Sequence, residues 1–146
     1  MLAQDLPVLA ENATAAFSTQ DWSILSRRFD HVRLLGCGDS FQAATAAVTF
    51  LAEFAGLEAQ VVGPRRVATE LAFEPKENLQ LLNRQLFVGI SASGATPAIC
   101  EALRVAKAAG AVTLALTGQK GSPVEAIVDQ TLVVSLTDKE PSPGIR

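Results

Sequence analysis

The stretch Leu86-Phe87-Val88-Gly89-Ile90-Ser91-Ala92-Ser93-Gly94-Ala95-Thr96-Pro97 joins an apolar run to a loop of small, hydroxyl-bearing residues. The run is short, partly β-branched and apolar on both faces, which predicts a strand buried in a parallel sheet. Pro97 is tolerated in the first turn of a helix, where its missing N–H is no loss. Apolar residues then recur at helical spacing. We therefore predict a strand over residues 86–90 and a helix over residues 96–109.

The loop between this strand and this helix has the chemistry of an anion site. It carries three hydroxyls, on Ser91, Ser93 and Thr96. The free backbone N–H groups and the positive end of the helix dipole point towards it, and both favour a phosphate or a carboxylate. Because the loop contains no Lys or Arg, we expect a neutral, hydrogen-bonding cradle.

The rest of the chain alternates helical and strand patterns joined by short loops. This alternation predicts an α/β fold, a three-layer doubly wound sandwich with a five-stranded parallel sheet. The expected domains are an N-terminal helical extension (residues 1–30), one ligand-binding domain (31–137) and an irregular tail (138–146). The expected elements are helices over residues 4–17, 22–29, 41–55 and 96–109, short helices after Pro64 and Ser122, and strands over 32–36, 58–62, 86–90, 112–116 and 131–134.

A second small, polar loop, Gly36-Cys37-Gly38-Asp39-Ser40, follows the first expected strand and leads directly into a helix. If the strand order is 2-1-3-4-5, the crossovers reverse direction between the first and third strands. That reversal opens a crevice at the carboxyl ends of these strands. Both loops would line it, so we infer this strand order and place the ligand site there.

Three other phosphate-binding designs fit less well. In a dinucleotide fingerprint Phe41 would stand where the third Gly is required, and Val61-Val62-Gly63 lacks the ribose-binding acid. A Walker A motif is absent, since no GK[ST] occurs in the sequence. A receiver domain needs a phosphorylatable Asp after the third strand, but Ser91 and Ser93 stand there.

Composition limits the possible partners. A net charge of −3 with scattered Lys and Arg argues against nucleic acid, and Glu53 interrupts the longest apolar segment, which argues against a membrane span. The first residues lack a secretory signal, so we expect a cytoplasmic protein. Cys37 and Cys100 do not form a CxxC or Cys/His cluster, so we expect two packed thiols. No cofactor or metal is expected.

At these residues the sequence resembles the sugar isomerase (SIS) domain family, most closely the isomerase half of glutamine–fructose-6-phosphate aminotransferases. The resemblance runs from about Val32 to Val134. It rests on residues 36–40 (family G-C-G-[TS]-S), on Thr69-Glu70-Leu71 (family S-E-F) and on residues 91–96 (family S-x-S-G-x-T).

The resemblance implies a sugar phosphate ligand of the hexose 6-phosphate class and a homodimer or higher homo-oligomer. It assigns the phosphate to Ser91, Ser93 and Thr96, and the sugar to Ser40. The expected binding set is completed by Gly38, Ala92 and Gly94.

The sequence departs from the aminotransferase pattern at three positions. Ala92 and Ala95 replace Gln and Glu, and Asp39 replaces Thr. Isomerisation needs a positioned base, and in those aminotransferases the catalytic Glu and His lie in a second SIS half or a neighbouring subunit. We therefore assign no catalytic residue, and two functions stay open. One is the SIS domain of an isomerase- or aminotransferase-like enzyme; the other is a non-catalytic sensor or regulatory module.

Several candidate residues also have simpler interpretations. Helix capping alone could explain the loop hydroxyls and Ser40. His31 is expected at the end of the first strand opposite the crevice. The remaining charged candidates, which fit solvent-exposed positions, are Arg65, Arg66, Glu70, Glu101 and Glu125.

Overall fold

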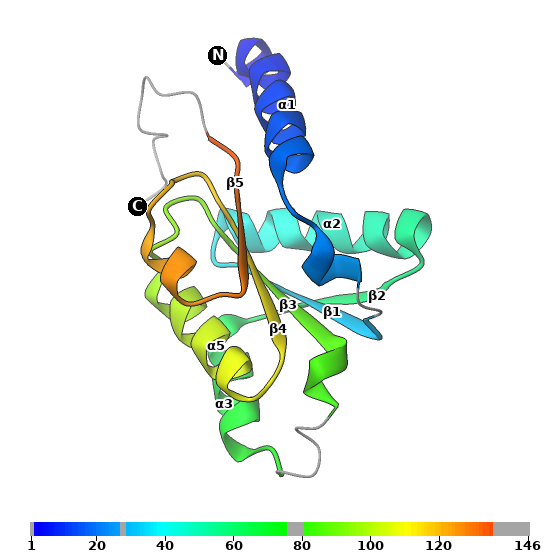
Figure 1. Ribbon diagram of the computed structural model, residues 1–146, viewed down its shortest axis with the longest axis vertical. Coiled ribbons are helices and arrows are strands. Elements are labelled where there is room, and N and C mark those ends of the chain that lie inside the picture. Colours follow the sequence, from blue (N-terminus) through cyan, green and yellow to red (C-terminus); the bar gives the residue numbers. More distant parts are fainter. Residues whose placement is uncertain (1, 27–28, 76–80, 136–146) are drawn as a thin grey trace.

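A five-stranded, wholly parallel sheet in the order β2-β1-β3-β4-β5 forms the centre of the computed structural model, which describes residues 2–26, 29–75 and 81–135 (Figure 1). The strands are β1 (His31–Leu35), β2 (Glu58–Val62), β3 (Gln85–Ser91), β4 (Val112–Thr117) and β5 (Gln130–Val133). The predicted fold class and strand order are confirmed, and each strand lies within one residue of its predicted limits.

Helices cover both faces of this sheet. Because right-handed crossovers reverse direction after β2, α2 packs on one face while α3 and α5 pack on the other (Figure 1). The helices are α1 (Leu2–Thr19), α2 (Asp39–Ala55), α3 (Pro64–Phe73) and α5 (Pro97–Ala108), with 3-10 turns η1 (Ser23–Ser26), η2 (Leu82–Arg84) and η3 (Pro123–Ala126).

The predicted helix over residues 22–29 is wrong. The structure has only the single 3-10 turn η1 there, and residues 27–28 lie outside the described residues. The Asp21 carboxylate accepts hydrogen bonds from the backbone N–H (2.9 Å) and the hydroxyl of Ser23. Such local side-chain bonds compete with helix formation. The tail predicted for residues 138–146 also lies outside the described residues.

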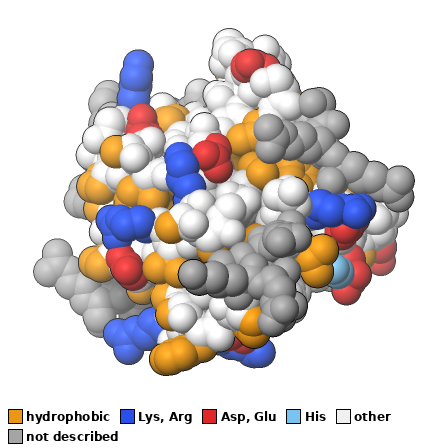
Figure 2. Space-filling view, turned by 60° about the horizontal axis from the view of Figure 1, so that its bottom comes forward, with side chains coloured by type: hydrophobic (Ala, Val, Ile, Leu, Met, Phe, Trp, Pro, Cys, Tyr) orange, Lys and Arg blue, Asp and Glu red, His pale blue; other side chains and the backbone are white. Residues whose placement is uncertain are grey.

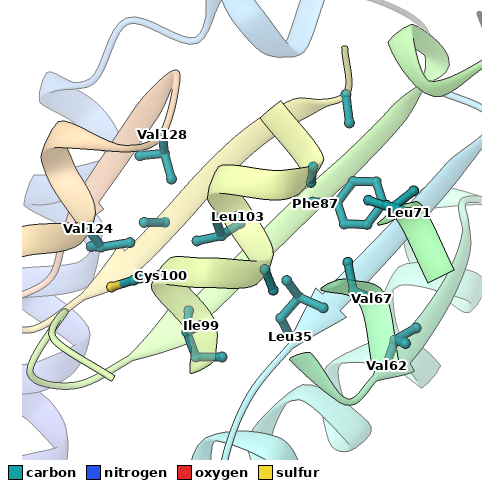
Figure 3. Close-up of a cluster of buried hydrophobic side chains, with 14 of the residues drawn as sticks. Leu35, Val62, Val67, Leu71, Phe87, Ile99, Cys100, Leu103, Val124 and Val128 are labelled. Atoms are coloured by element: carbon teal, nitrogen blue, oxygen red, sulfur yellow. The ribbon is translucent and has the colours of Figure 1, made fainter. Parts of the chain in front are cut away.

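The larger of two hydrophobic clusters fixes α5 on the sheet. Figure 3 shows its side chains, which include the fully buried Leu35, Phe87 and Leu103. A Cβ on Gly89 would lie 2.5 Å from Leu103 Cδ1, so the missing side chain in β3 lets α5 approach closely. The first turn of α5 is therefore held firmly at the carboxyl end of β3.

Within residues 2–26, 29–75 and 81–135, no helix combines the length and the apolar character needed to cross a membrane. Lys and Arg side chains are dispersed among acidic ones on the face that Figure 2 shows. That face therefore presents no concentrated basic patch.

Candidate functional site

The loop after β3 is built around a hydroxyl pair. Thr96 is the N-cap residue of α5, but its side chain makes no capping bond. Its Oγ1 instead lies 2.9 Å from Oγ of Ser91, the buried last residue of β3. Helix capping, the simpler interpretation, therefore does not account for these two hydroxyls, because they hydrogen-bond to each other across the loop.

The turn of this loop depends on glycine at position 94. Gly94 has a φ of +62°, in the left-handed region that disfavours other residues. A Cβ there would also lie 2.5 Å from Ser122 Cβ and 2.8 Å from Thr117 Oγ1. Gly94 is thus required both by backbone conformation and by close packing.

The loop is also bound to the segment that follows β4. The carbonyl of Ala92 accepts hydrogen bonds from the Gly118 N–H (3.0 Å) and the Thr117 hydroxyl (3.4 Å). The carbonyl of Gly94 accepts from the Val124 N–H (3.0 Å). These contacts direct the loop's negative carbonyl ends into the protein. The sequence analysis did not predict Thr117 or Gly118 as site residues and used Ser122 only as the start of a short helix, although Thr117-Gly118 is itself a polar strand end of the kind that marked the other two loops.

While the carbonyls of the loop bond inward, some of its backbone N–H donors have no partner among the described residues. Among the described residues, the backbone N–H groups of Ser93, Thr96 and Ala98 have no hydrogen-bond partner. Ser93 is exposed, and its Oγ accepts a bond from the Ala95 N–H at 3.3 Å. Exposed hydroxyls and unpaired N–H groups at the start of a twelve-residue helix attract an anion without any cationic side chain.

The loop over residues 36–40 makes an equally tight turn beside it. A Cβ on Gly36 would lie 2.5 Å from the backbone of Ser40. Gly38, with a φ of 55°, is the N-cap of α2, and no side chain caps this helix. Ser40 lies inside the first turn of α2, half-buried, so it is not a capping residue. Asp39 is exposed in the same turn, where its charge complements the helix dipole.

The expectation of two packed thiols is half wrong. Cys100 is buried, and its thiol lies 3.8 Å from the carbonyl of Gly94. Cys37 is exposed. The chain turns sharply after Gly36, whose contact with the Ser40 backbone leaves Cys37 on the outside of the turn.

The two loops follow neighbouring parallel strands, and a single cavity reaches both of them. Ser40 and Ala92 line it together with Thr117 and Gly118. Ser91, Ser93, Thr96, Gly38 and Gly94 do not line this cavity; Ser91 and Gly94 are buried in the loop itself. The structure thus brings one residue from each predicted loop to a shared space at the carboxyl edge of the sheet.

Glu70 belongs to an ion-pair network rather than to open solvent. Its carboxylate lies 2.5 Å from Arg66 Nε and 3.4 Å from an Arg33 guanidinium nitrogen. The Arg33 guanidinium in turn stacks over the Phe87 ring, 5.5 Å from its centroid. This network ties α3 to β1. His31 starts β1, opposite the predicted crevice, and pairs with Glu58 at 3.3 Å.

No cluster of three or more His, Cys, Asp or Glu side chains suited to a metal ion occurs in the described part of the chain. The loop over residues 91–96 offers hydrogen-bond donors and the N-terminus of α5 as its binding chemistry.

Comparison with known proteins identifies the family of the chain. A family model described as the SIS domain matches residues 24–141, and the chain belongs to that family. The predicted resemblance is thereby confirmed.

Two of the curated relatives that share sequence with the chain illustrate the match. The glutamine–fructose-6-phosphate aminotransferase [isomerizing] of Helicobacter pylori is 31% identical over 103 residues, covering 70% of this chain and 16% of the relative. The N-acetylmuramic acid 6-phosphate etherase of Actinobacillus succinogenes is 45% identical over 53 residues, covering 36% of this chain and 17% of the relative. The chain thus spans about a sixth of the length of these two relatives.

Solved structures share the fold. The sugar isomerase domain of an RpiR transcription factor from Sphaerobacter thermophilus superposes with a TM-score of 0.67 at 25% identity, covering 92% of this chain and 75% of that one. The Vibrio vulnificus NanR protein complexed with ManNAc-6P gives a TM-score of 0.65 at 17% identity, covering 89% of this chain and 50% of that one. The C-terminal domain of glucosamine–fructose-6-phosphate aminotransferase from Francisella tularensis gives a TM-score of 0.68 at 18% identity, covering 90% of this chain and 38% of that one.

Proposed function

We propose that residues 36–40 and 91–96 bind a sugar phosphate of the hexose 6-phosphate class. The observation that carries this proposal is how the hydrogen-bonding groups are oriented in the loop over residues 91–96, called the serine loop below. Its carbonyls at Ala92 and Gly94 bond inward, while its unpaired N–H groups and the exposed Ser93 hydroxyl remain available. The names of the two relatives and of the NanR complex refer to phosphorylated sugars, which supports the same ligand class.

In this proposal the phosphate lies against Ser93, Thr96 and the first turn of α5. The buried Ser91 holds the Thr96 hydroxyl by their 2.9 Å contact. Ala92 and Gly94 contribute backbone rather than side chains. Ser40, in the first turn of α2, lies on the sugar side at the shared cavity, and Gly38 precedes it as the N-cap of the helix.

Under the primary proposal the chain is the substrate-binding domain of an isomerase- or aminotransferase-like protein. Moving a proton between adjacent carbons needs a base placed within hydrogen-bond reach. The two loops contain one carboxylate, Asp39, and no His. The base then comes from a second SIS domain. The protein would act in the cytoplasm as a homodimer or larger homo-oligomer.

The second candidate function is a regulatory module that binds the same ligand without converting it. The observation favouring it is the fold shared with the RpiR transcription factor and with NanR. Incubation of the purified chain with fructose 6-phosphate tests the sensor function: a sensor binds the ligand and leaves it unchanged, and formation of an aldose phosphate would contradict that function.

Titration calorimetry with glucosamine 6-phosphate and with glucosamine tests the shared claim. We expect binding of the phosphorylated sugar only. The double variant Ser93→Ala/Thr96→Val should weaken it, because each lost hydrogen bond to a charged group costs about 1.5–3 kcal/mol.

A matched control is available on α1. The double variant Thr14→Val/Ser18→Ala removes the same types of hydroxyl, which bond only to carbonyls of their own helix. It should leave the affinity unchanged. Equal affinity for the sugar and its phosphate, or equal losses in both double variants, would contradict the proposal.

A further inference from the structure

The segment that follows β4 lies against the serine loop (Figure 1). Its tip, residues 118–121, is called the lysine turn below. At the start of this turn the Gly118 N–H donates to the Ala92 carbonyl at 3.0 Å. Directly after the turn comes the buried Ser122, whose Cβ would lie 2.5 Å from a Cβ on Gly94. Both ends of the lysine turn are therefore held against the serine loop.

Lys120 stands in the exposed part of this turn. Because consecutive Cα atoms are about 3.8 Å apart, its Cα lies within about 8 Å of the Cα atoms of both Gly118 and Ser122. Its four-carbon side chain adds about 6 Å of reach and ends in an ammonium group with three donors. The charge of Lys120 is therefore confined to the neighbourhood of the serine loop.

Most cations of this protein are neutralised by an ion pair. Of the seven Lys and Arg side chains in the described residues, five pair with a carboxylate: Arg33, Arg66, Arg84, Arg104 and Lys107. The other two, Lys120 and Arg65, have no ion-pair partner among these residues. Glu125, the acid nearest to Lys120 in the sequence, accepts a hydrogen bond from the Ser122 N–H at 3.0 Å instead. The charge of Lys120 thus remains available to a ligand.

The ligand proposed for this site calls for such a charge. A phosphate monoester carries a charge of about −1.5 to −2 at pH 7, and the serine loop itself contains no charged side chain. In the neighbouring loop, the exposed Asp39 adds a further negative charge. Lys120 is the only cation in the three segments that meet at this edge of the sheet, residues 36–40, 91–96 and 118–121. It is therefore placed to offset the charge of the phosphate.

We propose that Lys120 binds the phosphate from the β4 side and makes the site prefer a doubly charged phosphate to a singly charged anion. This inference rests on the proposed function, since it concerns the same ligand. Coulomb energy scales with the product of the two charges. Loss of the Lys120 charge therefore weakens the binding of a doubly charged ligand about twice as much, in free energy, as that of a singly charged one.

Titration calorimetry of the purified chain with glucosamine 6-phosphate and with glucosamine 6-sulfate tests this assignment, because the sulfate ester carries a single negative charge. We expect Lys120→Ala to weaken phosphate binding about 10-fold, the lower end of the range for a hydrogen bond to a charged group, and sulfate binding about 3-fold. Lys120→Arg keeps the charge and should restore the preference for the phosphate. Urea unfolding should be the same in all three proteins, because Lys120 is exposed.

Arg65→Ala is the matched control. It removes the other exposed cation without an ion-pair partner among the described residues, which lies in the first turn of α3 after β2. Since β2 is two strands away from β3, this turn is about 10 Å from the serine loop by the usual strand spacing. Salt at about 0.15 M screens exposed charges beyond about 8 Å. In this salt Arg65→Ala should therefore change neither affinity.

Equal affinity of Lys120→Ala and the wild type for the phosphate would overturn the inference. So would equal fold losses for the phosphate and the sulfate, or an equal loss in Arg65→Ala, since each indicates an effect other than contact with the doubly charged group. The same titrations separate this inference from the proposed function. A wild type that binds no glucosamine 6-phosphate contradicts the proposed function and with it this inference, whereas equally tight binding by the wild type and Lys120→Ala contradicts the inference alone.

Discussion

Replacing Gly94 with alanine tests how the serine loop is held. Its φ of +62° carries a cost for any residue with a Cβ, about 1–2 kcal/mol for the left-handed conformation. The added Cβ would also meet Ser122 Cβ at 2.5 Å and Thr117 Oγ1 at 2.8 Å. Overpacking of this kind costs about a further 1–3 kcal/mol. We expect Gly94→Ala to lose about 2–5 kcal/mol of unfolding free energy in urea, together with sugar phosphate binding.

Gly56→Ala is the matched control for this substitution. Gly56 ends α2 with a φ of +61°, almost the same as that of Gly94, but a Cβ there would meet no atom within 4 Å. The control should lose only the conformational part, about 1–2 kcal/mol, and should keep its affinity for the ligand. Equal stability losses in the two variants, or full ligand affinity in Gly94→Ala, would refute the packing explanation.

Three further predictions follow from the same structure. Gly36→Ala should cost about 1–3 kcal/mol in urea unfolding and weaken sugar phosphate binding, because its Cβ would lie 2.5 Å from the Ser40 backbone; unchanged stability would contradict that close contact. Asp129→Asn should lower the unfolding free energy at pH 7 by about 1.5–3 kcal/mol. Burial raises the pKa of Asp129, but hydrogen bonds from the side chain and the N–H of Thr113 lower it, as does Lys107. These lowering effects are the stronger ones and hold the pKa below its ordinary 3.8. Because the native pKa is the lower one, this stabilisation is complete above pH 3.8 and disappears as the pH falls through the native pKa; unfolding curves of the two proteins should converge in acid, and a constant difference would count against the assignment. Ser91→Ala should weaken ligand binding through Thr96, whose hydroxyl loses its 2.9 Å partner, and calorimetry showing no change would assign the pair a structural role only.

Local sequence signals predicted the elements that carry the site. Pro97 marked the start of α5 to within one residue, and the apolar run before Ser91 marked β3. The strand order followed from requiring the two polar loops to meet, an inference that needs no contact information. For α5 and β3 the signal lies within a few residues of the feature that it predicts.

The features that sequence analysis missed depend on contacts between distant segments. The bonds from Thr117 and Gly118 to Ala92 span about 25 residues, and no local pattern encodes them. Cys37 proved exposed because Gly36 packs on the Ser40 backbone, a contact that only the folded turn reveals. The predicted helix after Trp22 failed because the Asp21 side chain bonds to Ser23.

The most direct test of the central claim follows backbone amide signals by NMR while glucosamine 6-phosphate is added to the 15.3 kDa chain. If the phosphate lies on the serine loop, the largest shifts occur at the amides of Ser93, Thr96 and Ala98, which have no protein partner among the described residues. Glucosamine at the same concentration should leave these three signals in place. Shifts centred on another part of the sheet, or equal shifts with both sugars, would contradict the account.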